Sequence, residues 1–101
     1  MLFRSKKVTA QTNTTKTETF KVSGNCGMCK KNIEKAADIK GVIKADWNRD
    51  TKMITVEYSP EKVTIEKIKK MIAKSGYDND QYKASEADYN ALHGCCQYVR
   101  E

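Results

Sequence analysis

Hydrophobic and polar positions alternate from residue 17, so that Phe20 and Val22 share one face of a short segment that stops at Ser23-Gly24-Asn25. This alternation predicts a β-strand with one buried face. The period then lengthens to three and four residues, which predicts a helix over residues 28–39 that Gly41 ends. The apolar positions of this helix are Ile33, Ala36 and Ala37.

Two further runs of strand-forming residues, 42–47 and 53–58, flank the turn-rich segment 48–51 and predict a β-hairpin. The side chains expected to face the core are Ala45, Trp47, Ile54, Val56 and Tyr58. A second helix is predicted to begin after the N-cap Thr64 and to end at Ser75-Gly76. Its apolar stripe consists of Ile65, Ile68, Met71 and Ile72.

The predicted elements follow the order strand, helix, strand, strand, helix, and residues 77–84 offer a weaker last strand. This order predicts an α+β fold, a ferredoxin-like βαββαβ sandwich, over residues 17–84. We expect the polar, Thr-rich residues 1–16 to be a flexible segment. In residues 85–101, the capping pattern of Ser85 and Asp88 predicts a short C-terminal helix that runs to about residue 93 and is ended by Gly94.

Charge and hydropathy exclude two classes of partner. The 19 Lys and Arg against 13 Asp and Glu give a net charge of +6, but the lysine groups have no aromatic residues among them. A surface for nucleic acid would combine both, so we expect no nucleic-acid partner. No apolar run approaches the roughly 20 residues of a membrane-spanning helix, and we expect no direct membrane insertion.

The N-terminal segment leaves the compartment open. Val8-Thr9-Ala10 has the small-residue pattern of a signal-peptidase site, which would make the protein periplasmic or otherwise exported. The residues before it lack the apolar stretch of a signal peptide, and a cytoplasmic location is the alternative.

The candidate chemistry lies in Cys26-Gly27-Met28-Cys29, at the predicted junction of the first strand and the first helix. Two thiols separated by two residues can turn to one point in space. The amide groups and dipole of the first helical turn favour thiolates, Lys30 and Lys31 add positive charge, and Gly24 and Gly27 allow a tight backbone approach. Such a pair selects copper(I), zinc or other thiophilic ions over magnesium or calcium.

Several segments occur together at suitable distances: Lys21-Val22-Ser23-Gly24-Asn25-Cys26-Gly27-Met28-Cys29, the helix after it, Gly41-Val42, the hairpin, and Ser75-Gly76-Tyr77-Asp78. Over about residues 18–84 this combination resembles the heavy-metal-associated domain family, which includes copper chaperones, the periplasmic mercuric-ion binding protein and modules of metal-exporting P-type ATPases. The resemblance implies that Cys26 and Cys29 bind a soft ion, with copper(I) expected and zinc or mercury(II) as alternatives. It implies transfer of the ion to a metal-exporting P-type ATPase or another metal-transport protein by a non-enzymatic metallochaperone, which we expect to be a monomer.

The metal loop departs from the family's usual Gly-Met-x-Cys-x-x-Cys run. Here Gly24 is followed by Asn25 and then Cys26, so the loop is one residue shorter and lacks the Met that normally anchors it in the core. Met28 lies between the cysteines and is not the equivalent of that Met. Tyr77 stands where the family has an aromatic residue or a Lys close to the metal loop, and we expect it to pack there, with simple core packing as the alternative. The predicted loop-support residues are Gly24, Asn25, Met28 and Tyr77.

His93-Gly94-Cys95-Cys96 lies outside the family's pattern. The predicted last strand would end at the pole opposite the CxxC loop, and a nine-residue helix would then travel back by roughly 14 Å. Cys95 and Cys96 could thereby join Cys26 and Cys29 as metal ligands in a three- or four-thiolate site. Four thiolates would suit zinc, and two or three would suit copper(I).

Other interpretations of this tail stay open. Cys95 could continue the apolar stripe of the tail helix as a small buried hydrophobe, with Cys96 incidental. The tail cysteines could instead form a disulfide with the CxxC pair in an oxidising compartment. His93 is either a further ligand or a solvated helix cap.

One function of a different class uses the same CxxC motif, namely that of a dithiol–disulfide oxidoreductase. The chain lacks an aromatic residue before Cys26 and a proline between the two cysteines, both of which belong to the thioredoxin pattern. The sole histidine, His93, lies in the tail, which gives little support to other nucleophilic catalysis.

Overall fold

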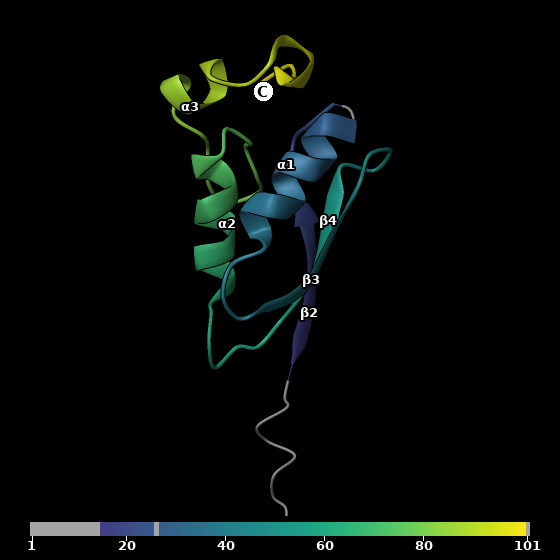
Figure 1. Cartoon of the computed structure of the whole chain (residues 1–101), viewed down its shortest axis with the longest axis vertical. Coiled ribbons are helices and arrows are strands. Elements are labelled where there is room, and N and C mark those ends of the chain that lie inside the picture. The colour runs from purple at the N-terminus through teal and green to yellow at the C-terminus, as the bar shows by residue number, and fades with distance from the viewer. Residues whose placement is uncertain (1–14, 26, 101) are drawn as a thin grey trace, which may run out of the picture.

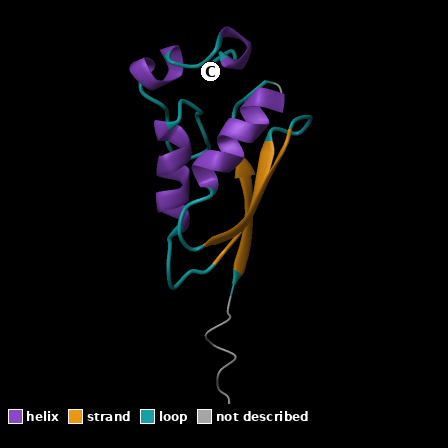
Figure 2. Ribbon diagram, in the orientation of Figure 1, coloured by secondary structure: helices purple, strands orange, loops and turns teal. Residues whose placement is uncertain are grey.

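The sheet of the computed structural model, which describes residues 15–25 and 27–100, has three antiparallel strands. Their order is β2 (Lys16–Lys21), β4 (Met53–Tyr58) and β3 (Val42–Asn48). The helices α1 (Gly27–Ala37) and α2 (Ile65–Lys74) lie on one face of this sheet (Figures 1 and 2). Most of the predicted N-terminal segment, with its three-residue cleavage pattern, lies outside the described residues, and so does Cys26.

The register of the sheet directs the predicted hydrophobic side chains toward the helices. Trp47 of β3 is opposite Ile54 of β4, and both are fully buried. Val56 and Tyr58 are buried with them, as the alternation predicts, while Thr19 and Thr55 face each other on the open side with their hydroxyl oxygens 3.1 Å apart. The buried side chains that the helices add are Ile33, Ala37, Ile68 and Ile72. These observations confirm the predicted α+β class.

Local signals set the helix boundaries. Thr64 caps α2, and its hydroxyl oxygen accepts a hydrogen bond from the Lys67 N–H at 3.1 Å, as predicted. α1 ends at Ala37, two residues earlier than predicted. The chain then turns through Gly41, whose φ of +99° is unfavourable for other residues, and a Cβ there would lie only 2.8 Å from a methyl carbon of Val63.

Residues 77–84 do not form the predicted fourth strand. A single antiparallel bridge joins Asn79 to Val22, and the chain then turns. The turn forms because the Asn79 carboxamide oxygen accepts hydrogen bonds from the N–H groups of Gln81 and Tyr82, at 3.2 and 3.0 Å. The expectation that this segment crosses to the opposite pole is therefore wrong, because the turn brings the chain back toward the loop that precedes α1.

The C-terminal tail contains α3 (Glu86–Asn90) and the 3₁₀-helix η2 (Gly94–Cys96). Ser85 caps α3 as predicted, with its hydroxyl oxygen accepting from the Asp88 N–H at 3.1 Å. The helix is shorter than predicted, and Gly94 begins η2 where we expected it to end α3. Figure 1 shows the tail lying across the first turn of α1 and the end of α2.

Gly76, two residues after the end of α2, allows the tail to pack closely. Its φ is +104°, and a Cβ at this position would lie 2.8 Å from the carbonyl oxygen of Asp88 and 2.9 Å from a methyl carbon of Leu92. Any side chain would push the tail away. In the part of the chain that the structure describes, no helix is both long and apolar enough to cross a membrane.

Candidate metal centre

Cys29 lies in the first turn of α1 and is fully buried. Gly27 and Met28, which precede it, are exposed, and Met28 keeps 44% of its accessible surface. Met28 therefore does not anchor the loop in the core, in agreement with its assignment as a residue distinct from the family's Met. Cys26, the other half of the motif, remains a prediction from the sequence.

The indole of Trp47 lies directly beneath the loop that leads to α1. Its ring N–H donates to the Val22 carbonyl at 2.9 Å. Gly24 is buried above the same ring, where a Cβ would lie 3.0 to 3.1 Å from two carbons of the indole and from a methyl carbon of Ile33. A loop without the family's core Met thus rests on a tryptophan from the hairpin, and glycine at position 24 is what lets the two surfaces meet.

Lys30, which we expected to add positive charge near the cysteines, pairs with two carboxylates. Its ammonium group donates to Glu34 and Asp46 at 2.7 Å and to the Trp47 carbonyl at 2.8 Å. The hydrogen bonds that Lys30 donates to Asp46 and Glu34 raise the pKa of Lys30, and the hydrogen bond from Lys30 lowers the pKa of Asp46. The role of Lys30 is to join α1 to the hairpin.

A second thiol, that of Cys96, lies against Cys29. Cys96 is the last residue of η2, and both cysteines have no exposed surface. The Cys96 side chain is hydrogen-bonded to Cys29 and to the hydroxyl of Tyr77, which is itself fully buried. The fold therefore brings a tail cysteine to the CxxC end of the molecule, although not by the route that the sequence suggested.

Tyr77 links this cluster to α1. Its hydroxyl oxygen accepts a hydrogen bond from the Asn32 side-chain amide at 3.1 Å, which leaves its O–H to donate to Cys96. Burial raises the pKa of Tyr77 well above its usual value, although the Asn32 hydrogen bond opposes the change. Burial, followed by the hydrogen bond to Cys29, raises the pKa of Cys96 to about 12 in the metal-free protein, while the Tyr77 hydrogen bond lowers it. Tyr77 thus packs in the core and contacts the thiol cluster at the same time.

Cys95 has the opposite environment from Cys96. It is exposed, and its sulfur lies 4.0 Å from that of Cys96, while its carbonyl oxygen accepts a hydrogen bond from the Asn25 side chain at 3.2 Å. The interpretation in which Cys95 is buried and Cys96 incidental is therefore wrong. His93 is exposed, and within residues 15–25 and 27–100 no three His, Cys, Asp or Glu side chains are arranged to hold a metal ion.

Three residues fix the tail on the fold, and we call Asp78, Tyr98 and Arg100 the tail anchor. The Tyr98 hydroxyl accepts from the Asp78 N–H and donates to the Gly76 carbonyl, both at 2.8 Å and buried. The Arg100 guanidinium donates to the two Asp78 carboxylate oxygens at 2.8 and 3.0 Å and to the Ala84 carbonyl at 2.7 Å. Burial alone would raise the pKa of Asp78, but the hydrogen bonds from Arg100 and Ala84 outweigh it and hold the pKa below its usual value.

Sequence reasoning missed the tail anchor and Asn32. Tyr98 also stacks near Tyr77, with ring centroids 6.1 Å apart, and meets Tyr89 edge to face at 5.0 Å. These contacts join residues that are far apart in the chain, and no periodic pattern marks them. The one available signal was Gly76, since a glycine after a helix end also permits a close neighbour.

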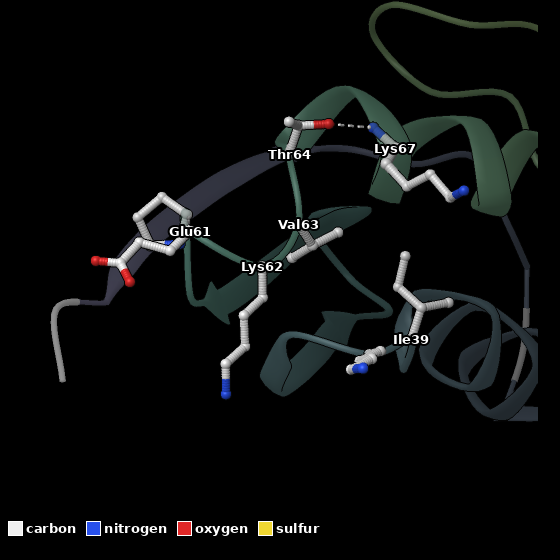
Figure 3. A pocket seen from close by; sticks show the side chains of 8 residues that line it. Ile39, Glu61, Lys62, Val63, Thr64 and Lys67 are labelled. Carbon is white, nitrogen blue, oxygen red and sulfur yellow. Dashed lines mark hydrogen bonds between the residues drawn. The ribbon is translucent and has the colours of Figure 1, made fainter. Parts of the chain in front are cut away.

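A hollow of about 480 Å³ lies at the other end of α2, around its N-cap (Figure 3). Its lining includes Ile39, Lys62, Val63, Thr64 and Lys67. It holds neither cysteine nor histidine, and it is separate from the thiol cluster.

The sequence profile of the heavy-metal-associated domain matches residues 19–78. The chain belongs to this family. The match covers the CxxC motif and ends at Asp78, so the tail that carries Cys95 and Cys96 follows the matched heavy-metal-associated domain. The resemblance seen in the sequence is thereby confirmed.

Relatives and solved structures of the family agree with the fold. A copper chaperone CopZ from Staphylococcus epidermidis is 42% identical over 61 residues, which make up 58% of this chain and 90% of that protein. Oxidised MerP from Ralstonia metallidurans CH34 has a TM-score of 0.62 at 30% identity, over 66% of this chain and 96% of that one. The Cu(I)-loaded N-terminal domain of a potential copper-translocating P-type ATPase from Bacillus subtilis has a TM-score of 0.61 at 28% identity, over 72% and 100%. The ferredoxin-like fold of the heavy-metal-associated domain is thus confirmed.

Proposed function

We propose that this protein binds copper(I) through the thiolates of Cys26 and Cys29 and transfers it to a partner protein. The observation that carries the proposal is the position of Cys29, which is buried in the first turn of α1 within the residues that match the family. Soft thiolates favour copper(I), and the relatives include copper chaperones and a Cu(I)-loaded domain. Zinc and mercury(II) are the competing ions.

Transfer follows from the chemistry of low-coordinate thiolate sites. A thiolate of the partner can bond to the ion before a thiolate of this chain leaves, so neither a general base nor a catalytic residue is needed. The proposed partner is the metal-binding domain of a copper-transporting P-type ATPase or another metal-transport protein, because domains of such ATPases share this fold. Lysines on the exposed sides of the two helices offer an acidic partner a docking surface.

The test of binding is an anaerobic titration of the fully reduced protein with copper(I) against a chromophoric competing chelator. The wild type is expected to bind one ion, and the double variant Cys26→Ser/Cys29→Ser is expected to lose that binding. The matched control is Cys95→Ser, which removes an exposed thiol and leaves the binding unchanged. Equal affinity of the double variant and the wild type would refute the assignment of the ligands.

The test of transfer mixes the copper-loaded protein with the isolated metal-binding domain of such an ATPase and separates the two by ion exchange. We expect copper to distribute between the two proteins within the mixing time. The same experiment with zinc-loaded protein shows whether transfer is specific for copper. Retention of all copper by this chain would contradict a role in transfer.

Two hypotheses from the sequence gain no support from these relatives. None of the proteins named above is a dithiol–disulfide oxidoreductase by its description, and none of their descriptions indicates export. A reduction potential of the cysteine pair measured alongside the titration separates the first of these hypotheses from metal binding.

A further inference from the structure

We propose that Cys96 is a third thiolate ligand of the transferred ion, supplied by the tail beside Cys29. This inference rests on the proposed function, because it adds a ligand to the same site. The heavy-metal-associated domain ends its match at Asp78, so the ligand belongs to a part of the chain that the family pattern does not include.

The first support is the hydrogen bond between the side chains of Cys29 and Cys96. Cys96 is hydrogen-bonded to Cys29, and neither has exposed surface, although one lies in α1 and the other in η2. Two thiols this close can share one ion with small movements of their side chains. A soft ion that binds Cys29 therefore has the Cys96 sulfur available as a neighbouring ligand.

The second support is that groups other than sulfur hold Cys96 in place. The tail anchor fixes the residues after Cys96 through buried hydrogen bonds of Tyr98 to the backbone of Gly76 and Asp78. The side-chain amide of Gln97 also donates to the carbonyl oxygen of Leu92, at 3.2 Å. The position of Cys96 is thus preorganised by the fold, as a ligand site requires.

The third support is the donor beside the Cys96 sulfur. Asn32 occupies a lone pair of the Tyr77 hydroxyl, which directs its O–H toward Cys96. Three thiolates around a monovalent ion leave a net charge of −2, and an adjacent O–H donor offsets part of it. This buried tyrosine therefore has a use beyond packing.

The tail contributes one ligand and not two. Cys95 is exposed, whereas Cys96 has no exposed surface and lies against Cys29. Cys95 and Cys96 are consecutive in a 3₁₀-helix, where neighbouring side chains point in different directions. The arrangement favours three-coordinate copper(I) over a four-thiolate zinc site.

The experiment counts the sulfur ligands of bound copper(I) by X-ray absorption at the copper edge. The samples are reduced, monomeric, full-length protein loaded with one equivalent under anaerobic conditions. We expect three sulfur ligands in the wild type and in the matched control Cys95→Ser, and two in Cys96→Ala. In the chelator competition, Cys96→Ala is expected to bind roughly tenfold more weakly or worse, and Cys95→Ser as tightly as the wild type.

Each outcome bears on one of the two proposals. Two sulfur ligands in the wild type, with unchanged affinity in Cys96→Ala, would overturn the role of Cys96 and leave the proposed function standing. Failure of the wild type to bind copper(I) would overturn the proposed function itself. If Cys96→Ala does not fold, the wild type is compared with Tyr98→Phe, which keeps every cysteine. We then expect three sulfur ligands in the wild type and two in Tyr98→Phe.

Discussion

Removal of the Tyr98 hydroxyl is the sharpest test of how the tail is held. This hydroxyl accepts from the Asp78 N–H and donates to the Gly76 carbonyl, and both hydrogen bonds are buried. Tyr98→Phe leaves both backbone groups without this partner while it keeps the ring contacts with Tyr77 and Tyr89. Each unsatisfied buried group costs about 1–3 kcal/mol, so we expect the loss of both partners to destabilise the docked tail by about 2–6 kcal/mol.

The assay is the rate at which a neutral alkylating reagent modifies Cys96 in the reduced, metal-free protein, followed by mass spectrometry. Cys96 has no exposed surface and its pKa is raised to about 12, so it reacts when the tail opens. A loss of about 2–6 kcal/mol corresponds to a rate higher by roughly 30- to 20,000-fold. The exposed Cys95 sets the upper limit, since a fully undocked tail would make the two cysteines react alike.

The matched control is Tyr82→Phe, which removes a hydroxyl from a half-buried tyrosine whose ring lies near Lys70. It is expected to change the rate at Cys96 by less than threefold, since surface changes typically alter stability by less than about 0.5 kcal/mol. A Tyr98→Phe rate within threefold of the wild type would refute the reasoning, because it would mean that the buried hydrogen bonds of Tyr98 do not hold the tail.

Further predictions concern the loop floor and acid pH. Gly24→Ala is expected to lower the free energy of unfolding in urea by about 1–3 kcal/mol, because the new Cβ would press on Trp47, whereas Gly27→Ala, with open space around its Cβ, changes it little. Trp47→Phe combined with Gly24→Ala should cost less than the sum of the two single changes, and strict additivity would contradict the contact. The pKa of Asp78 lies below the value of about 3.9 of an exposed Asp. The ion pair with Arg100 therefore stabilises the docked tail above about pH 4. This stabilisation is lost as the pH falls through the pKa of Asp78 in the folded protein. The nuclear magnetic resonance signal of the Asp78 carboxyl carbon should therefore stay constant from pH 5 to 8, and a transition of this signal near pH 6 would contradict the assignment.

Local patterns predicted most of the fold. The cap at Thr64 follows from its place before an apolar helical stripe, and the burial of Trp47 and Ile54 follows from alternation within each strand. The structure has each of these features. The missing fourth strand had a visible signal as well, since Asn79 stands in the turn-forming run Asp78-Asn79-Asp80. Its carboxamide binds nearby backbone groups in place of a neighbouring strand.

The tail was harder to predict because its geometry depends on contacts across the fold. The apolar stripe predicts that Cys95 faces the core if the helix continues to about residue 93. Because α3 ends at Asn90, the helical spacing no longer determines which way Cys95 faces. The burial of Cys96 then follows from the Arg100 pair with Asp78 and from Tyr98. The sequence contains both residues of such a pair, but no local pattern shows that they contact each other.

The strand order of the sheet has a consequence for the chain during its synthesis. β2 pairs with β4, which is made more than thirty residues later, while β3 and β4 are joined by a short turn held by the Asn48 side chain. The hairpin can therefore form on the ribosome before the N-terminal strand has a partner. Cys29 stays accessible through that interval, and Cys96 is made 67 residues after Cys29. A nascent chain of this protein thus exposes Cys29 to the surrounding metal and oxidant until the residues that bury it have been made.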